Sequence, residues 1–141
     1  MSGFDLSTVG DVTEREDAGQ VVHLRDASGE PLFTGEPQTQ PVTITVAGTY
    51  STRFRRAQDQ LQQRMLKKRQ RDLTPELITA NRTELVAAAI LEWQGISDKG
   101  QPLPCTKENA IRLLTAAPWI REQLEEAQQD HAGFTKPASR S

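Results

Sequence analysis

Alternating apolar and polar residues mark the first third of the chain as β-structure. Val42, Ile44 and Val46 alternate with threonines in VTITVAG, which is the pattern of a strand with one buried face. Two shorter strands are indicated upstream, in QVVHLRD (20–26) and LFTG (32–35), with a Gly/Pro turn between them. We therefore predict a small antiparallel sheet of about three strands, whose apolar face must be covered by other elements.

The apolar spacing becomes helical after Gly48. Apolar residues then recur every three or four positions, and Ser51 or Thr52 is placed to cap a helix. The rest of this predicted helix is basic or glutamine-rich, so its apolar face is only a narrow seam. The seam residues are Tyr50, Phe54, Ala57, Leu61 and Met65.

Three further helices are predicted downstream. Thr74 and Pro75 are typical of an N-cap and a first helical residue, and they open a helix with a broad apolar face that we expect to continue to Gly95. Thr106 caps a short third helix, and Pro118 opens a last one. The side chains expected to face inward from the last helix are those of Trp119, Ile120, Leu124 and Ala127, with Phe134 anchoring its end.

These patterns predict one α+β domain over residues 19–134, with β-structure in 19–48 and about four helices in 50–134. A chain of 141 residues is long enough for one modest core. Residues 1–18 are acidic and lack a sustained period, so we expect a flexible arm there, and we expect residues 135–141 to form a disordered tail.

No catalytic or ligand-binding constellation is evident in the sequence. His23 and His131 have no Cys, Asp or Glu at metal-ligand spacing, and no glycine-rich phosphate cradle occurs. Cys105 lies between Pro104 and a predicted N-cap, where a buried or incidental thiol is the simpler interpretation. The sequence therefore predicts a protein that is not an enzyme and has no cofactor or metal.

Cysteine usage and hydropathy bear on the compartment. A single cysteine cannot form an internal disulfide, and no apolar run of signal-peptide length opens the chain. The longest strongly apolar run, residues 85–91, is far short of the roughly 20 residues of a membrane span. We expect a soluble protein of a reducing cytoplasm, with no membrane partner.

Basic charge is concentrated between Arg53 and Arg71. This segment carries eight basic residues and one acidic residue, Asp59, or +7, against −2 for the whole chain, so the remainder carries −9. Three interpretations stay open: a solvated helix face, a helix that binds the phosphates of DNA or RNA, and a protein-docking helix whose long stems cover apolar surface on a partner. The sequence pI of about 5.7 and the lack of a nucleic-acid fold signature weigh against the second. Acidic residues at both ends of the chain could neutralise the segment, within one chain or between subunits.

The order of several short segments resembles a known family. GEPLF, PVTITVAG, YSTRFRRAQ, RMLKKRQR, LTPE, EWQGI, QPLPCTKENAIRLL and PWIREQLEEAQQDHAGF follow one another over about residues 20–134. In this order they resemble the tail assembly chaperones of long-tailed phages and prophages, in the short form. The most recognisable parts are EWQGI, LPCTKENA and PWIREQ.

That resemblance implies a small protein of the host bacterial cytoplasm that binds the tape-measure protein and keeps it soluble. It also implies help in recruiting tail-tube subunits, and absence from the finished virion. In such families a longer, frameshifted form often adds a domain that contacts the tube protein. The strongly basic helix is a departure: if the bound region of the tape-measure protein is also basic, the helix is expected to pair instead with the acidic ends of a neighbouring copy, that is, in a homo-oligomer.

The apolar seam and the basic residues beside it are the candidate site for a partner or for self-association. Packing of Tyr50 and Phe54 onto the predicted sheet is an equally good interpretation of those two residues. The candidates are Tyr50, Phe54, Leu61, Arg64, Met65, Lys67, Lys68, Arg69 and Arg71.

Overall fold

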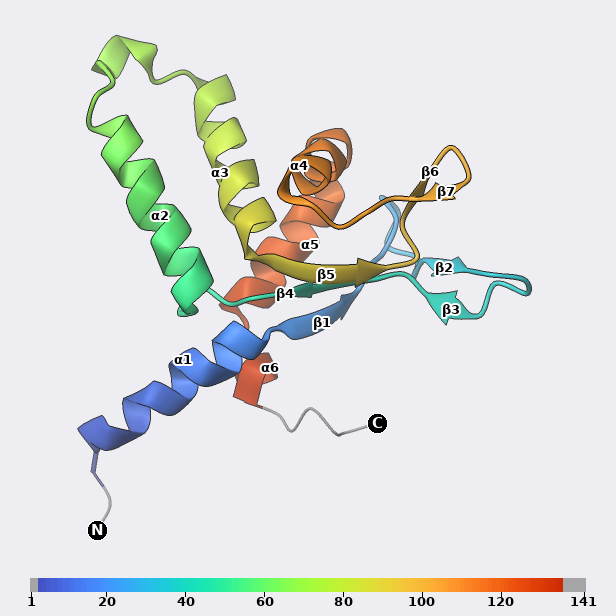
Figure 1. Cartoon of the computed structure of the whole chain (residues 1–141), viewed down its shortest axis with the longest axis horizontal. Coiled ribbons are helices and arrows are strands. Elements are labelled where there is room, and N and C mark those ends of the chain that lie inside the picture. The colour runs from blue at the N-terminus through green and yellow to red at the C-terminus, as the bar shows by residue number, and fades with distance from the viewer. Residues whose placement is uncertain (1–2, 136–141) are drawn as a thin grey trace.

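The fold was analysed in a computed structural model, which describes residues 3–135. The predicted α+β class is confirmed: a three-stranded antiparallel sheet packs against helices (Figure 1). Of the expected tail, 135–141, residues 136–141 lie outside the described residues, and Thr135 closes the last helix. The helices are η1 (Leu6–Thr8), α1 (Val9–Ala18), α2 (Thr52–Met65), η2 (Gln70–Asp72), α3 (Pro75–Ala89), α4 (Lys107–Ala116), α5 (Pro118–Gln129) and α6 (His131–Thr135), where η marks a 3-10 helix.

The central sheet has the order β1-β4-β5, so the strand predicted most clearly is its middle strand. Ile44 and Val46 are fully buried, while the threonines between them are only half-buried, as the alternation predicts. The covered face meets buried side chains of three helices, among them Val86, Leu114 and Leu124. The strands are β1 (Gln20–His23), β2 (Phe33–Thr34), β3 (Gln40–Pro41), β4 (Thr43–Val46), β5 (Ile90–Gln94), β6 (Ser97–Asp98) and β7 (Gln101–Pro102).

The third strand of this sheet comes from a segment that we predicted as helix. β5 pairs antiparallel with β4, and Ile44 lies opposite Trp93. The prediction that α3 continues to Gly95 is therefore wrong, because ILEWQ combines β-branched and aromatic residues that fit a half-buried strand. The expected strand at 32–35 instead pairs with β3 in a separate two-stranded sheet. The chain just before it stays beside the end of β1, through the bridge between Arg25 and Pro31 and the hydrogen bond that the N–H of Leu32 donates to the carbonyl of Leu24.

Most helix starts were predicted correctly. The side chains of Ser51, Thr74 and Thr106 each accept a hydrogen bond from the backbone N–H three residues later. Pro118 opens α5, and Ile120 and Leu124 are buried as expected. Trp119 is exposed, contrary to expectation, because it lies on the other side of α5 from this buried pair.

The flexible arm expected over residues 1–18 is wrong for its described part. Residues 9–18 form α1, whose C-terminal end docks on the body of the protein while its N-terminal end extends away from it (Figure 1). Glu16 is buried and accepts a hydrogen bond from the backbone N–H of Tyr50 at 2.8 Å. None of the helices described between residues 3 and 135 combines the length and the apolar character that a bilayer span needs.

Candidate interaction surface

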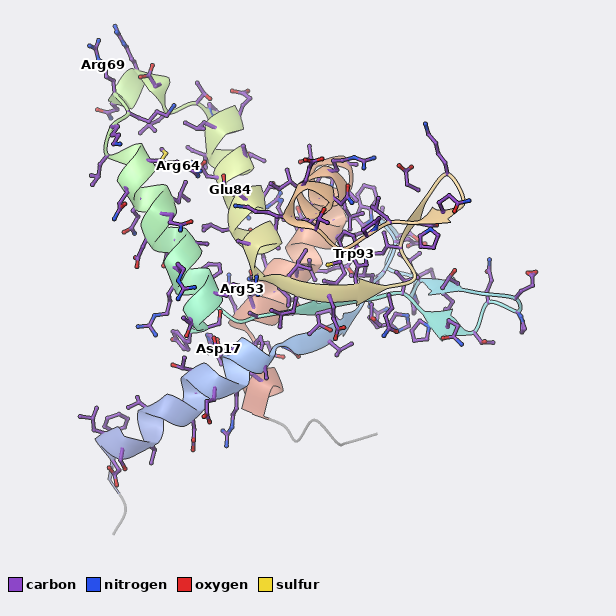
Figure 2. The ribbon with its side chains drawn as sticks, viewed as in Figure 1. Asp17, Arg53, Arg64, Arg69, Glu84 and Trp93 are labelled. Atoms are coloured by element: carbon purple, nitrogen blue, oxygen red, sulfur yellow. The ribbon has the colours of Figure 1, made fainter. Side chains whose placement is uncertain are left out.

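The predicted basic segment forms the first helix of a helical hairpin and the connection that follows this helix. α2 and α3 run antiparallel, stand up from one end of the sheet, and are connected at the far end through η2 (Figure 1). Nη2 of Arg64 donates to both carboxylate oxygens of Glu84 at 3.0 Å, and Nδ2 of Asn81 donates to the sulfur of Met65 at 3.4 Å. Figure 2 shows Arg64 and Glu84 between the two helices. These contacts hold the C-terminal end of α2 against α3.

Glu84 also affects the pKa of Arg64. The hydrogen bonds that Arg64 donates to Glu84, together with the charge of the Glu84 carboxylate, raise the pKa of Arg64 above its ordinary value. Among residues 3–135, Arg64 is the one basic candidate whose side chain forms an ion pair.

The residues of the predicted apolar seam pack in different places. Phe54 is in the core, and Leu61 and Met65 are half-buried on the side of α2 that meets α3. Tyr50 precedes α2, is about half exposed, and stacks its ring on His131 with centroids 4.3 Å apart. For Phe54, packing into the core is therefore the correct interpretation, while Tyr50 packs on α6 and not on the sheet.

The basic segment 53–71 is not one continuous helix. α2 ends at Met65, and Lys67, Lys68, Arg69 and Arg71 lie in the connection to α3. Continuing the helix would place Arg64 above Lys68 and Lys67 above Arg71, and like charges four residues apart destabilise a helix. The seam positions after Met65 would also be occupied by cations, with nothing apolar to bury.

This connection, residues 66–73, is here called the hairpin tip. Within residues 3–135, no ion pair joins Lys67, Lys68, Arg69 or Arg71 to an acidic side chain. Figure 2 shows Arg69 at the outermost end of the hairpin. The tip also exposes apolar side chains: Leu66 is 85% exposed, and Leu73 and Ile78 are exposed nearby.

The exposed apolar residues of the tip were missed by sequence reasoning. Leu66 falls outside the seam spacing, and Leu73 lies before the predicted N-cap Thr74 and belongs to no predicted helix. Their exposure follows from the end of α2 at Met65, which only the structure reveals. One sequence feature could have indicated this exposed surface: Leu66 stands directly beside two lysines, in Leu66-Lys67-Lys68.

A groove lies at the other end of the hairpin, between α2, α3 and the start of α4. It has a volume of about 640 Å³, and Arg53, Arg56 and Lys107 line it together with the acidic Asp17 and Glu84. Neither histidine lines the groove, and the described residues contain no group of His, Cys, Asp and Glu side chains that could hold a metal. The mixed charges show no preference for one class of ligand.

Cys105 also lines this groove. Of the buried and the incidental thiol considered from sequence, the structure excludes the first, because Cys105 is exposed, although neighbouring atoms partly shield the sulfur from water. This partial burial, helped by the charge of Glu92, raises the pKa of the Cys105 thiol above its ordinary value. Activated nucleophilic cysteines have a lowered pKa, so this environment is the opposite of what activation requires.

Most of the chain matches a known protein family. Residues 47–139 match the family described as YdaY prophage protein. The chain belongs to this family. The match begins at the end of β4 and includes the whole α2–α3 hairpin and the helices that follow it.

This membership confirms the phage or prophage origin that the resemblance implied. Comparisons with curated proteins and with solved structures returned no match. The narrower expectation, a tail assembly chaperone, therefore stays a prediction.

Proposed function

We propose that this prophage protein is a tail assembly chaperone, which binds the tape-measure protein in the host cytoplasm and keeps it soluble. It would help to recruit tail-tube subunits, through a longer frameshifted form where one is made, and would be absent from the finished virion. The order of segments described above supports this proposal, and membership of a prophage family is consistent with it.

The observation that carries the proposal is the composition of the hairpin tip. Within residues 3–135, the four cations of the tip form no ion pair, and they lie in the same short connection as Leu66, which is 85% exposed, at the far end of the helical hairpin. Lys and Arg stems can cover apolar surface on a partner while their charged ends stay in water. A surface of this kind suits weak, adaptable contacts along a long helical protein, which is what a chaperone that keeps its client soluble requires.

The test is co-expression with the tape-measure protein encoded nearby in the same genome. The chaperone role predicts that the tape-measure protein becomes soluble and is captured with this protein, also after nuclease treatment. The finished particles should lack this protein, whereas a structural virion protein would be found in them.

The nucleic-acid alternative gives a different result in the same experiment. A phosphate-binding hairpin predicts captured material rich in DNA or RNA, an insoluble tape-measure protein, and an affinity that falls steeply between about 50 and 200 mM salt. That outcome would reject the chaperone role.

A further inference from the structure

A second exposed apolar surface lies at the N-terminal end of α1, away from the hairpin tip (Figure 1). Phe4 and Leu6 are 80% and 75% exposed, and Val9 and Val12 of α1 are also exposed. Val9 and Val12 share a helix face with the buried Glu16, because these residues are spaced by three and four. The face of α1 that docks on the body thus continues outward as an uncovered apolar stripe.

This part of α1 stands clear of the body. No hydrogen bond or ion pair in the described part of the chain joins residues 4–11 to anything beyond η1 and α1. Figure 1 shows α1 extending away from the sheet, while the hairpin tip lies at the far end of α2. α2 has 14 residues, so its length of about 21 Å separates the tip from the end of α1 that meets it. Residues 3–18, here called the arm, therefore cannot reach the tip of the same molecule.

The two surfaces are complementary in charge. The arm, residues 3–18, contains five acidic residues and one arginine, and Asp11 and Glu14 are exposed on it. The hairpin tip contains four basic residues and Asp72. Each surface exposes apolar side chains, and opposite charges around apolar contacts favour one partner orientation over others.

We propose that the arm of one copy docks on the hairpin tip of a second copy of this chain. The apolar stripe of Leu6, Val9 and Val12 packs on Leu66 and Leu73, and the acidic residues beside it face the cations of the tip. The two patches differ, so the contact is head-to-tail and leaves a free arm and a free tip at the ends. Copies then add in a row, which forms a ring if the rotation between copies closes and an open filament if it does not. This contact does not rest on the chaperone role, and at any one tip the arm of another copy competes with the tape-measure protein.

The test measures the mass of the purified full chain by sedimentation and light scattering over a range of concentrations. We expect the average mass to rise with concentration at about 50 mM salt, and at least tenfold weaker association at about 500 mM, where exposed charges are strongly screened. A protein that stays monomeric at low salt and high concentration would overturn the proposal.

Charge reversal tests which surfaces meet. One variant reverses the arm (Asp11→Lys, Glu14→Lys) and another reverses the tip (Lys67→Glu, Lys68→Glu, Arg69→Glu, Arg71→Glu). Each alone should be monomeric, since the arm variant loses the acidic excess of its arm and the tip variant carries acidic charge on both surfaces. Mixed, the two should associate again, because the unmodified acidic arm of the tip variant meets the unmodified basic tip of the arm variant, and this recovery also shows that both variants are folded.

A control variant reverses two exposed acids of α5 instead, Glu122→Lys and Glu126→Lys. It should associate like the unmodified protein. The proposal fails if the arm and tip variants still associate, or if their mixture stays monomeric while circular dichroism shows that both are folded.

Discussion

Glu16 and His131 are 115 positions apart in the sequence, and the ring Nδ1 of His131 donates a hydrogen bond to the Glu16 carboxylate. Glu16 also accepts from the backbone N–H of Tyr50, and the Tyr50 ring stacks on His131. One buried carboxylate therefore joins α1, the start of α2 and α6. Beside it, Asp17 accepts a hydrogen bond from the backbone N–H of Thr52 at 2.6 Å and so binds the N-terminus of the basic helix.

Replacing Glu16 should therefore destabilise the protein. Glu16→Ala removes the partner of both the Tyr50 N–H and the His131 ring, and each hydrogen bond contributes about 0.5 to 1.5 kcal/mol, so the loss should be about 1 to 3 kcal/mol. Urea unfolding should show this loss in the free energy of unfolding. Glu14→Ala, on the exposed side of the same helix, should change it by less than about 0.5 kcal/mol. Equal effects of the two variants would show that the Glu16 contacts contribute nothing specific.

Gly48 is needed for the close approach of Glu16. A Cβ at residue 48 would overlap Oε1 of Glu16 and lie 3.1 Å from the ring of Phe134. We expect Gly48→Ala to lower the free energy of unfolding by about 1 to 3 kcal/mol through overpacking. Gly10→Ala is the matched control, because nothing lies near a Cβ there and alanine favours the helix by about 0.5 to 1 kcal/mol. The midpoint temperature of thermal unfolding should therefore fall for Gly48→Ala and rise for Gly10→Ala.

The Arg64–Glu84 pair should orient the hairpin more than it stabilises the fold. Both side chains are partly exposed, at 54% and 31%, and exposed ion pairs contribute about 0 to 1 kcal/mol. A double-mutant cycle with Arg64→Ala and Glu84→Ala should give a coupling energy below about 1 kcal/mol. A coupling of several kcal/mol would mean that the pair is shielded from water, against the observed exposure.

Cys105 should react slowly at neutral pH despite its exposure. Because partial burial and Glu92 raise its pKa, less thiolate is present near pH 7 than in free cysteine. Alkylation by iodoacetamide, followed by mass spectrometry, should be slower than for free cysteine at that pH and should accelerate as the pH rises. Glu92→Gln should increase the neutral-pH rate. A rate above that of free cysteine would contradict the assigned cause.

The features that sequence predicted well are those determined by local chemistry. Val42, Ile44 and Val46 lie on the buried face of the central strand region, and Thr74 with Pro75 opens α3 as expected. Alternation and capping involve neighbouring residues, so a single sequence contains the information. The same holds for the α+β class and for four of the helices.

The features that sequence missed depend on tertiary contacts. The helix α1 has few apolar residues, and the position that docks it is occupied by a charged residue, Glu16, whose burial only its partners explain. β5 continues an apolar run from α3 without a break, so periodicity could not place the change from helix to strand. The candidate site was predicted as a continuous helix, whereas the structure divides it into core contact, helix–helix contact and exposed tip.

The proposed binding of the tape-measure protein to the hairpin tip can be tested with two variants that lose the same charge, Lys67→Gln with Lys68→Gln at the tip and Arg55→Gln with Arg56→Gln near the base of α2. The measured quantity is the fraction of tape-measure protein that each variant keeps soluble. The tip variant should lose most of this activity while the base variant retains it. Equal solubility with both variants and the unmodified protein would contradict the assignment of the tip, and no solubilisation by the unmodified protein would reject the chaperone role itself.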